Sequence, residues 1–155
     1  MYSTVMVPLD GSELAEAALP HASEIARLTG ARMVLVRGFD PIASLAPALG
    51  GIGSGGYTAG ELIEETARVE HEEAEKYLIA RAAELRTQGV EVETRALRGN
   101  VIESLTGLAR ELPSAIVVMT SRGRGGLKRF VLGSVTDALL HRLEIPVVVV
   151  PNRPD

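Results

Sequence analysis

The sequence predicts an α/β fold in three layers, with helices on both faces of an open, parallel, five-stranded sheet. Short apolar runs alternate with segments whose apolar residues recur at helical spacing, and this alternation continues along the 155 residues. Two of the runs, Met33–Val36 and Ile116–Met119, are continuously apolar, which is typical of strands buried on both faces. In such sheets ligands bind at the carboxyl ends of the strands.

The first strand is expected at Thr4–Leu9, because this apolar run ends at Asp10, Gly11 and Ser12, which supply a turn and a helix cap. The helix after it is expected to span residues 12–29. Its apolar positions recur at helical spacing and are Leu14, Ala18, Ala22, Ile25 and Leu28. We expect this helix to bend at Pro20, which lacks an amide hydrogen.

The second strand is expected at Arg32–Gly38. Residues 39–58 are rich in Gly, Ala, Pro and Ser without periodicity, so they predict a long loop. A long helix follows from about Ala59 to Gln88, and Gly89 is expected to end it in a left-handed conformation. Its inward face is predicted to be Leu62, Val69, Ala74, Leu78, Ala82 and Leu85, and its many acidic residues are interpreted as a solvated face.

The third strand, Val90–Arg98, alternates apolar and charged residues, which predicts a half-exposed strand at an edge of the sheet. The next helix begins at Asn100, with Glu103 placed as in a capping box, and ends near Leu112. Its apolar stripe consists of Val101, Ile102, Leu105, Leu108 and Ala109. The fourth strand is expected at Ala115–Thr120.

The last helix is expected from Ser134 to Leu143, with Ser134 and Asp137 as a second capping box. The fifth strand, Val147–Val150, is bracketed by two prolines that stop it at both ends. Because it is apolar and last in the chain, it predicts a sheet edge that a second copy covers in a homodimer. The alternative is that the flanking prolines alone protect the edge.

Composition places the chain among ordinary globular proteins, with 46% apolar and 23% charged residues and a formal net charge of -4, so we expect residues 1–155 to form a single domain. The absence of cysteine excludes disulfides and thiolate metal sites. The sequence starts without a basic and apolar leader and has no run of membrane-spanning length, so we expect a cytoplasmic protein without a membrane partner. His21, His71 and His141 lie on separate helices without the spacing of metal ligands.

The segment from Thr120 to Ser134 has the features of a phosphate site. Three glycines leave backbone N–H groups uncovered, namely Gly123, Gly125 and Gly126, and Gly133 with Ser134 opens a helix whose first amides need acceptors. Between Leu112 and Thr136 there are no acidic residues but four basic ones, Arg122, Arg124, Lys128 and Arg129, of which we expect one to contact phosphate. A positive loop on an acidic protein favours an anionic small molecule over nucleic acid. The alternative is a turn that only connects a strand to a helix.

Motifs of other nucleotide enzymes are missing. The sequence contains neither a Gly-x-x-x-x-Gly-Lys-Ser/Thr loop nor a Gly-x-Gly-x-x-Gly turn after the first strand. Ser12 and Ser134 have no histidine partner nearby in sequence, and both stand where helix caps are expected. We therefore predict no catalytic residues.

Four segments resemble the universal stress protein family over essentially the whole chain: Val5–Ser12, Met33–Gly38, Gly99 with Asn100, and Val117–Ser134. The last is similar to the pattern Gly, two residues, Gly, nine residues, Gly, Ser or Thr of the ATP-binding branch, with Thr120 in place of the first glycine. The resemblance implies the strand order 3-2-1-4-5 and the Rossmann-like fold of the adenine nucleotide alpha hydrolases. It also implies homodimers through the terminal strand, and binding of ATP, with ADP or AMP as alternatives. A β-branched residue at position 120 is expected to crowd the ribose or the phosphates.

The resemblance also implies roles for residues. Asp10 would accept hydrogen bonds from ribose hydroxyls or hold Mg²⁺ through water, the alternative being a cap at the start of the helix. The backbone at Arg37 and Gly38 would face the adenine edge, and Gly99 would either pass near the site or form a simple turn. The nucleotide site expected in this way is Val7, Pro8, Asp10, Arg37, Gly38, Met119, Thr120, Arg122, Gly123, Arg124, Gly125, Gly126, Gly133, Ser134 and Val135.

Three functions are compatible with this sequence. The first is a stress-response protein that binds an adenine nucleotide and regulates other proteins through its occupancy or its dimer state. The second is a slow ATPase or autokinase that uses Mg²⁺ near Asp10. The third is a dimeric scaffold that has lost nucleotide binding through Thr120.

Overall fold

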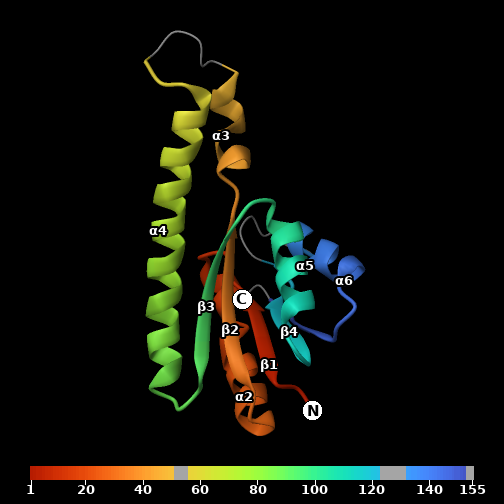
Figure 1. Ribbon diagram of the computed structural model, residues 1–155. Helices are drawn as coiled ribbons and strands as arrows, with labels where there is room; N and C mark the ends of the chain where they lie inside the picture. Colours follow the sequence, from red (N-terminus) through yellow and green to blue (C-terminus); the bar gives the residue numbers. More distant parts are fainter. Residues whose placement is uncertain (51–55, 123–131, 153–155) are drawn as a thin grey trace.

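A computed structural model describes residues 1–50, 56–122 and 132–152, and its five strands form one parallel sheet in the order β3-β2-β1-β4-β5, as predicted (Figure 1). Helices cover both faces. The elements, in chain order, are β1 (Thr4–Pro8), α1 (Glu13–Glu16), α2 (Leu19–Thr29), β2 (Arg32–Phe39), α3 (Pro41–Leu49), α4 (Ala59–Arg86), β3 (Val92–Arg98), α5 (Val101–Glu111), β4 (Ala115–Thr120), α6 (Ser134–Arg142) and β5 (Val147–Val150).

The position of β1 between β2 and β4 explains why its residues are apolar at successive positions. It pairs in parallel with β2 from Thr4 to Pro8 and with β4 from Thr4 to Met6. Val5 and Val7 pack in the half of the core that α1, α2 and α4 cover, whereas Met6 packs in the half under α5 and α6. Both faces of β1 are therefore removed from water, as expected for a parallel sheet with helices on both sides.

The predicted helix at 12–29 is wrong as a single element, because α1 and α2 are separate helices. Pro20 lies in the first turn of α2, where a missing amide hydrogen costs nothing, so the chain begins a new helix there instead of bending one. Leu14 and Leu28 are 43% and 77% exposed, although they share the helical spacing. The buried residues of the two helices are smaller and are Ala15, Ala18, Ala22, Ser23 and Ala26.

The loop predicted at 39–58 contains α3, which is a second correction. The side chain of Asp40 caps this helix, since its Oδ1 accepts hydrogen bonds from the amides of Ile42 and Ala43, both at 3.1 Å. Pro41 follows directly in the first turn, a position that suits proline. Asp40 followed by Pro41 is thus the sequence signal for the start of this helix. The residues after it show no amphipathic pattern, so the sequence pattern predicted a loop.

The long helix α4 lies alongside β3 and β2, and its first turns with α3 extend beyond the sheet (Figure 1). Its buried residues are Ala67, Ala74, Leu78, Ala82 and Leu85. Val69, predicted to face inward, is 39% exposed. Because each helical residue turns by about 100°, Val69 lies about 140° around the helix from Ala74, and Ala67 takes its place on the buried face.

The capping box predicted at Ser134 is also wrong. The N-cap of α6 is Gly133, whose carbonyl accepts from the amide of Asp137 at 2.9 Å, and among the described residues no side chain caps this helix. The amide of Gly133 donates to the carbonyl of Ser121 at 2.7 Å, so this contact sets where the helix begins. Within the described ranges, no helix combines the length and the apolar composition that crossing a membrane requires.

Candidate functional site

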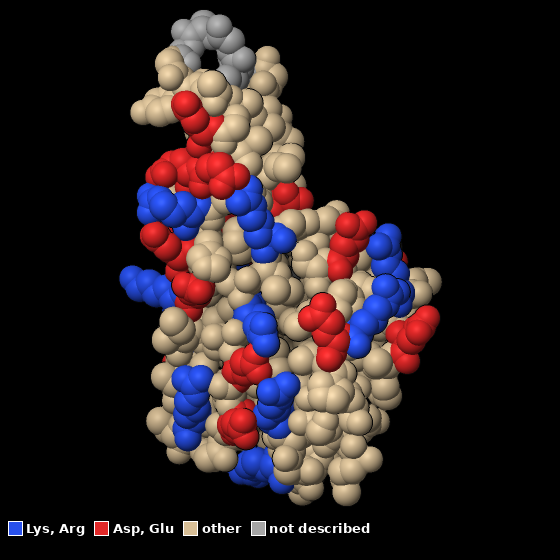
Figure 2. All heavy atoms as spheres, viewed as in Figure 1, with Lys and Arg blue, Asp and Glu red and all other residues tan. Residues whose placement is uncertain are grey.

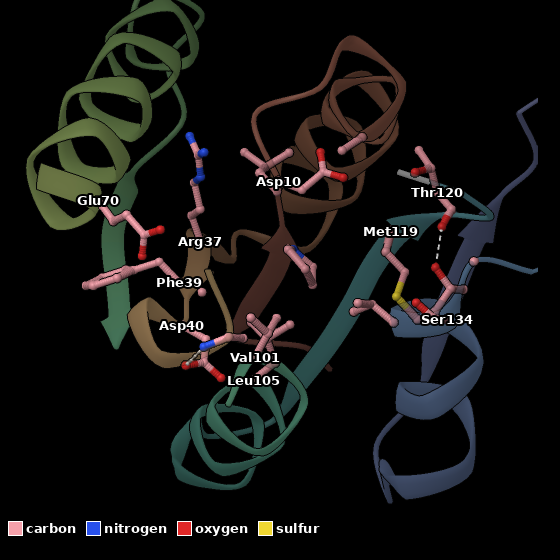
Figure 3. Close-up of a pocket in the computed structure, with 18 of the residues that line it drawn as sticks. Asp10, Arg37, Phe39, Asp40, Glu70, Val101, Leu105, Met119, Thr120 and Ser134 are labelled. Atoms are coloured by element: carbon pink, nitrogen blue, oxygen red, sulfur yellow. Dashed lines mark hydrogen bonds between the residues drawn. The ribbon is translucent and has the colours of Figure 1, made fainter. Parts of the chain in front are cut away.

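A cleft of about 550 Å³ opens at the carboxyl ends of β1, β2 and β4, and the close-up in Figure 3 shows the side chains around it. This is the edge at which parallel α/β sheets bind ligands, and the volume suits a small molecule. The cleft brings together nine of the residues predicted from the sequence, namely Pro8, Asp10, Arg37, Gly38, Met119, Thr120, Gly133, Ser134 and Val135.

Asp10 reaches the cleft through the turn between β1 and α1. Its Oδ1 accepts from the amide of Ser12 at 2.9 Å and from the Ser12 hydroxyl at 2.5 Å. The Ser12 hydroxyl in turn accepts from the amide of Ala15 and caps α1. Asp10 therefore shapes the start of the helix and lines the cleft as well, so its two predicted roles are compatible in geometry.

Arg37 is held at the side of the cleft by contacts with Tyr77 and Gly11. Its guanidinium carbon lies 5.3 Å from the centre of the Tyr77 ring, within the range of a cation–π contact. The guanidinium also lies close to Gly11, because a Cβ there would be 3.0 Å from Nη1. Gly11 has a φ of +86°, so the turn needs glycine for its conformation and for the space that Arg37 occupies.

Thr120 ends β4 and lines the cleft with only 5% of its surface exposed. Its hydroxyl donates to the carbonyl of Arg122 at 2.7 Å, and its own carbonyl accepts from the hydroxyl of Thr136 at 2.9 Å. The side chain is therefore bonded to the chain that leaves β4, and the bond to Thr136 joins β4 to the first turn of α6.

Hydrogen bonds hold the chain on both sides of the glycine-rich segment that contains Gly123, Gly125 and Gly126. Asn152 donates through Nδ2 to the carbonyl of Arg122 at 2.7 Å and through its amide to the hydroxyl of Ser121 at 3.0 Å. On the other side, the bond from Gly133 to Ser121 fixes the start of α6. The residues after β5 thus help to position this wall of the cleft.

Several predicted residues do not line the cleft. The side chain of Val7 is fully buried in the core, and Arg122 stands beside the glycine-rich segment without lining the cavity. Gly99 has a φ of +124° and makes the turn before α5 without lining the cleft, which agrees with the simpler interpretation of that residue. Predicted residues that lie outside the described ranges are Gly123, Arg124, Gly125, Gly126, Lys128 and Arg129.

Sequence reasoning missed the wall that α3 and α4 contribute. Glu70 and Glu73 line the cleft from α4, together with Asp40 and Ser44 from the start of α3. The Ser44 hydroxyl lies 2.5 Å from Oε1 of Glu70 and 3.0 Å from the carbonyl of Asp40, and its contact with Glu70 joins α3 to α4. The only signal in the sequence was the helical spacing of Glu70 and Glu73 with Ala67 and Ala74, which are both buried.

Charged side chains outside the cleft are interleaved. Figure 2 shows acidic and basic residues alternating along α4 and β3 on the face that it displays. An ion pair between α4 and β3 is part of this arrangement, because Glu64 pairs with Arg98 at 2.7 Å. The Arg98 guanidinium holds the pKa of the Glu64 carboxyl below its usual value. Within the described ranges, no three His, Asp or Glu side chains group as metal ligands.

Comparison with known proteins gives a consistent result. The family profile described as "Universal stress protein family" matches residues 1–151. The universal stress protein MJ0531 of Methanocaldococcus jannaschii is 30% identical over 150 residues, which cover 97% of this chain and 82% of that protein. The solved structure of the hypothetical protein MJ0577 is similar with a TM-score of 0.84 and 26% identity over 100% of this chain and 99% of that one.

Two other solved structures contain nucleotides. A universal stress protein in complex with cAMP has a TM-score of 0.67 and 23% identity, and one from Archaeoglobus fulgidus in complex with dAMP has a TM-score of 0.60 and 21% identity. Each covers 96% of this chain and is itself covered to 97%, and at these identities the likeness shows the fold. The sheet order, the match over residues 1–151 and the relative at 30% identity together show that this chain belongs to the universal stress protein family.

Proposed function

We propose that this protein binds ATP or another adenine nucleotide in the cleft and acts as a regulatory module in a stress response. The observation that carries the proposal is the cleft of about 550 Å³, in which Asp10 and the start of α6 come together at the carboxyl ends of the strands. The cAMP and dAMP complexes of proteins with the same fold support the choice of an adenine nucleotide.

The cleft suggests how the nucleotide lies. The start of α6 at Gly133, Ser134 and Val135 has no side-chain cap, which suits phosphate oxygens because the first amides of a helix attract anions. The glycines from Gly123 to Gly126 would add further backbone donors. Asp10 would accept from the ribose hydroxyls, and the backbone of Arg37 and Gly38 would face the base.

Mg²⁺ is part of this proposal through Asp10. One carboxylate with several waters and phosphate oxygens is a usual environment for Mg²⁺, so Asp10, which lines the cleft, fits the ion. When bound, Mg²⁺ would neutralise phosphate charge. Asp10 would hold its hydration shell.

Thr120 does not argue against binding. Its hydroxyl is bonded to the carbonyl of Arg122, and this contact keeps the side chain against the chain that leaves β4. We therefore favour a nucleotide-binding protein over a scaffold that has lost its ligand. We also propose that it acts in the cytoplasm, since a chain without cysteine suits a reducing compartment.

The test is direct. Mass spectrometry should detect an adenine nucleotide that is released when gently purified protein is denatured. Saturating ATP with Mg²⁺ should raise the Tm of the protein. If no nucleotide copurifies and calorimetry detects no heat with ATP, ADP or AMP, the binding function is rejected and the scaffold is favoured. A turnover assay of the natural chain against Asp10→Ala separates a binding module from a slow ATPase.

We further propose a two-fold homodimer through β5. Val147–Val150 are all only partly buried, and in the described part of the chain β5 pairs only with β4, so its other side is an apolar edge. A second copy would cover this edge in an isologous interface. Light scattering at micromolar concentration should give the mass of a dimer, and a monomeric mass would mean that Pro146 and Pro151 alone protect the edge.

A further inference from the structure

The start of α6 is held to the end of β4 by two hydrogen bonds. The amide of Gly133, the N-cap of α6, donates to the carbonyl of Ser121 at 2.7 Å. The buried hydroxyl of Thr136 donates to the carbonyl of Thr120 at 2.9 Å. The first three amides of α6 have no partner within the helix, as at every helix start. The direction in which they point therefore depends on where the carbonyls of Thr120 and Ser121 lie.

The carbonyl of Ser121 is itself fixed between two other contacts of the backbone. On one side, the amide of Ser121 donates to the carbonyl of Val150, the last residue of β5, at 2.9 Å. On the other side, the carbonyl of Arg122 accepts from the Thr120 hydroxyl and from Nδ2 of Asn152, both at 2.7 Å. Because a peptide group is planar, holding the backbone on both sides of the peptide between residues 121 and 122 sets the direction of the Ser121 carbonyl.

Asn152 supplies two of the bonds in this arrangement. Besides the bond from Nδ2 to the carbonyl of Arg122, its amide donates to the hydroxyl of Ser121 at 3.0 Å. Asn152 is partly buried and follows the end of β5 by two residues. It does not line the cleft, so its effect on a ligand passes through residues 121 and 122.

We propose that Asn152 is a positioning residue for the phosphate end of the cleft, because it holds residues 121 and 122 and thereby aims the first amides of α6 at the phosphates of the nucleotide. This inference rests on the proposed function and adds the residue that aligns the phosphate-binding amides. Amides that are held before the ligand arrives lose little freedom on binding, whereas amides on a loosened support must be ordered at the expense of affinity. Loss of the Asn152 side chain should therefore weaken the contacts to the phosphates and leave those to adenosine unchanged.

The test measures the Kd of ATP and of adenosine by calorimetry, in the presence of Mg²⁺, for the natural chain, Asn152→Ala and the matched control Ser3→Ala. The Ser3 hydroxyl also donates to the carbonyl of a residue distant in sequence, Pro113, at 2.7 Å, but it does so at the amino ends of the strands, away from the cleft. Because one hydrogen bond is at stake, Asn152→Ala should bind ATP more weakly by on the order of threefold to tenfold, with the Kd of adenosine unchanged. Ser3→Ala should bind both compounds as the natural chain does.

The outcomes separate positioning from a purely structural role. Equal weakening of ATP and adenosine in Asn152→Ala, an unchanged affinity for ATP, or equal binding of the two compounds by the natural chain overturns the role of Asn152 while nucleotide binding stands. If the natural chain binds adenosine too weakly to measure, the affinity of Asn152→Ala for ATP decides against that of Ser3→Ala, because only the first should fall.

A second variant covers the case in which Asn152→Ala does not fold. Ser121→Ala removes the hydroxyl that accepts from the amide of Asn152, so it should weaken ATP binding relative to adenosine in the same direction. An unchanged ratio of the two Kd values in this variant overturns the proposal. Failure of the natural chain to bind ATP rejects the proposed function together with this inference.

Discussion

Replacing Gly11 by alanine tests the turn that carries Asp10 into the cleft. Gly11 has a φ of +86°, and an L-residue in this region costs roughly 1–2 kcal/mol. The added Cβ would also lie 3.0 Å from Nη1 of Arg37, but this is the end of a flexible side chain that can move. For a chain of this length, roughly 1–2 kcal/mol corresponds to a fall in Tm of about 2–8 °C.

Gly107→Ala is the matched control, because it makes the same chemical change in the interior of α5. Nothing lies within 4 Å of a Cβ at Gly107, and alanine is favoured over glycine inside a helix by about 0.5–1 kcal/mol. Thermal and urea unfolding followed by circular dichroism should therefore give opposite signs for the two variants. If Gly11→Ala is as stable as the natural chain while Gly107→Ala is stabilised, the backbone argument for the Gly11 turn is wrong.

Three further predictions concern the core, the cleft and a tyrosine. Leu78→Ala should lower the free energy of unfolding by about 2–5 kcal/mol in urea titration, because Leu78 is fully buried between α4 and the sheet. Thr120→Val should cost about 1 kcal/mol in the same assay, because valine keeps the shape of the side chain and removes the bond to Arg122. Burial, with Glu16 nearby, raises the pKa of Tyr77 to about 12. Since this exceeds the usual pKa of about 10, the protonated phenol of Tyr77 contributes to folding stability below about pH 10, and this contribution is lost as the pH rises through about 12. Ultraviolet titration should show one tyrosine that ionises at a higher pH than the others, and this step should be absent in Tyr77→Phe.

Much of the candidate site could be predicted because its residues follow directly from the ends of strands. The apolar run Ala115–Thr120 has the same bounds in the structure, and Met119 and Thr120 at its end line the cleft. Pro8 and Asp10 follow the end of β1 in the same way. The strand order came from the family resemblance, since periodicity alone does not determine which strands are neighbours.

The acidic wall of the cleft could not be predicted in this way. Glu70 and Glu73 stand in a helix rich in carboxylates, most of which are solvated, and only their helical spacing with Ala67 and Ala74 distinguishes these two. They reach the cleft because α4 packs across β2 and β3 and because Ser44 of α3 bonds to Glu70. Those contacts join residues that are far apart in sequence.

By itself, the sequence determined where the five strands lie and, for β3, β4 and β5, the residue at which each strand ends. These are local properties, because hydrophobic period and backbone preference act within a few residues. Only the tertiary structure decided that Ser134 is the first residue of α6 and not its cap, and that Glu70 lines the cleft. Both depend on hydrogen bonds between segments that are distant in sequence, and such contacts exist only after the chain has folded.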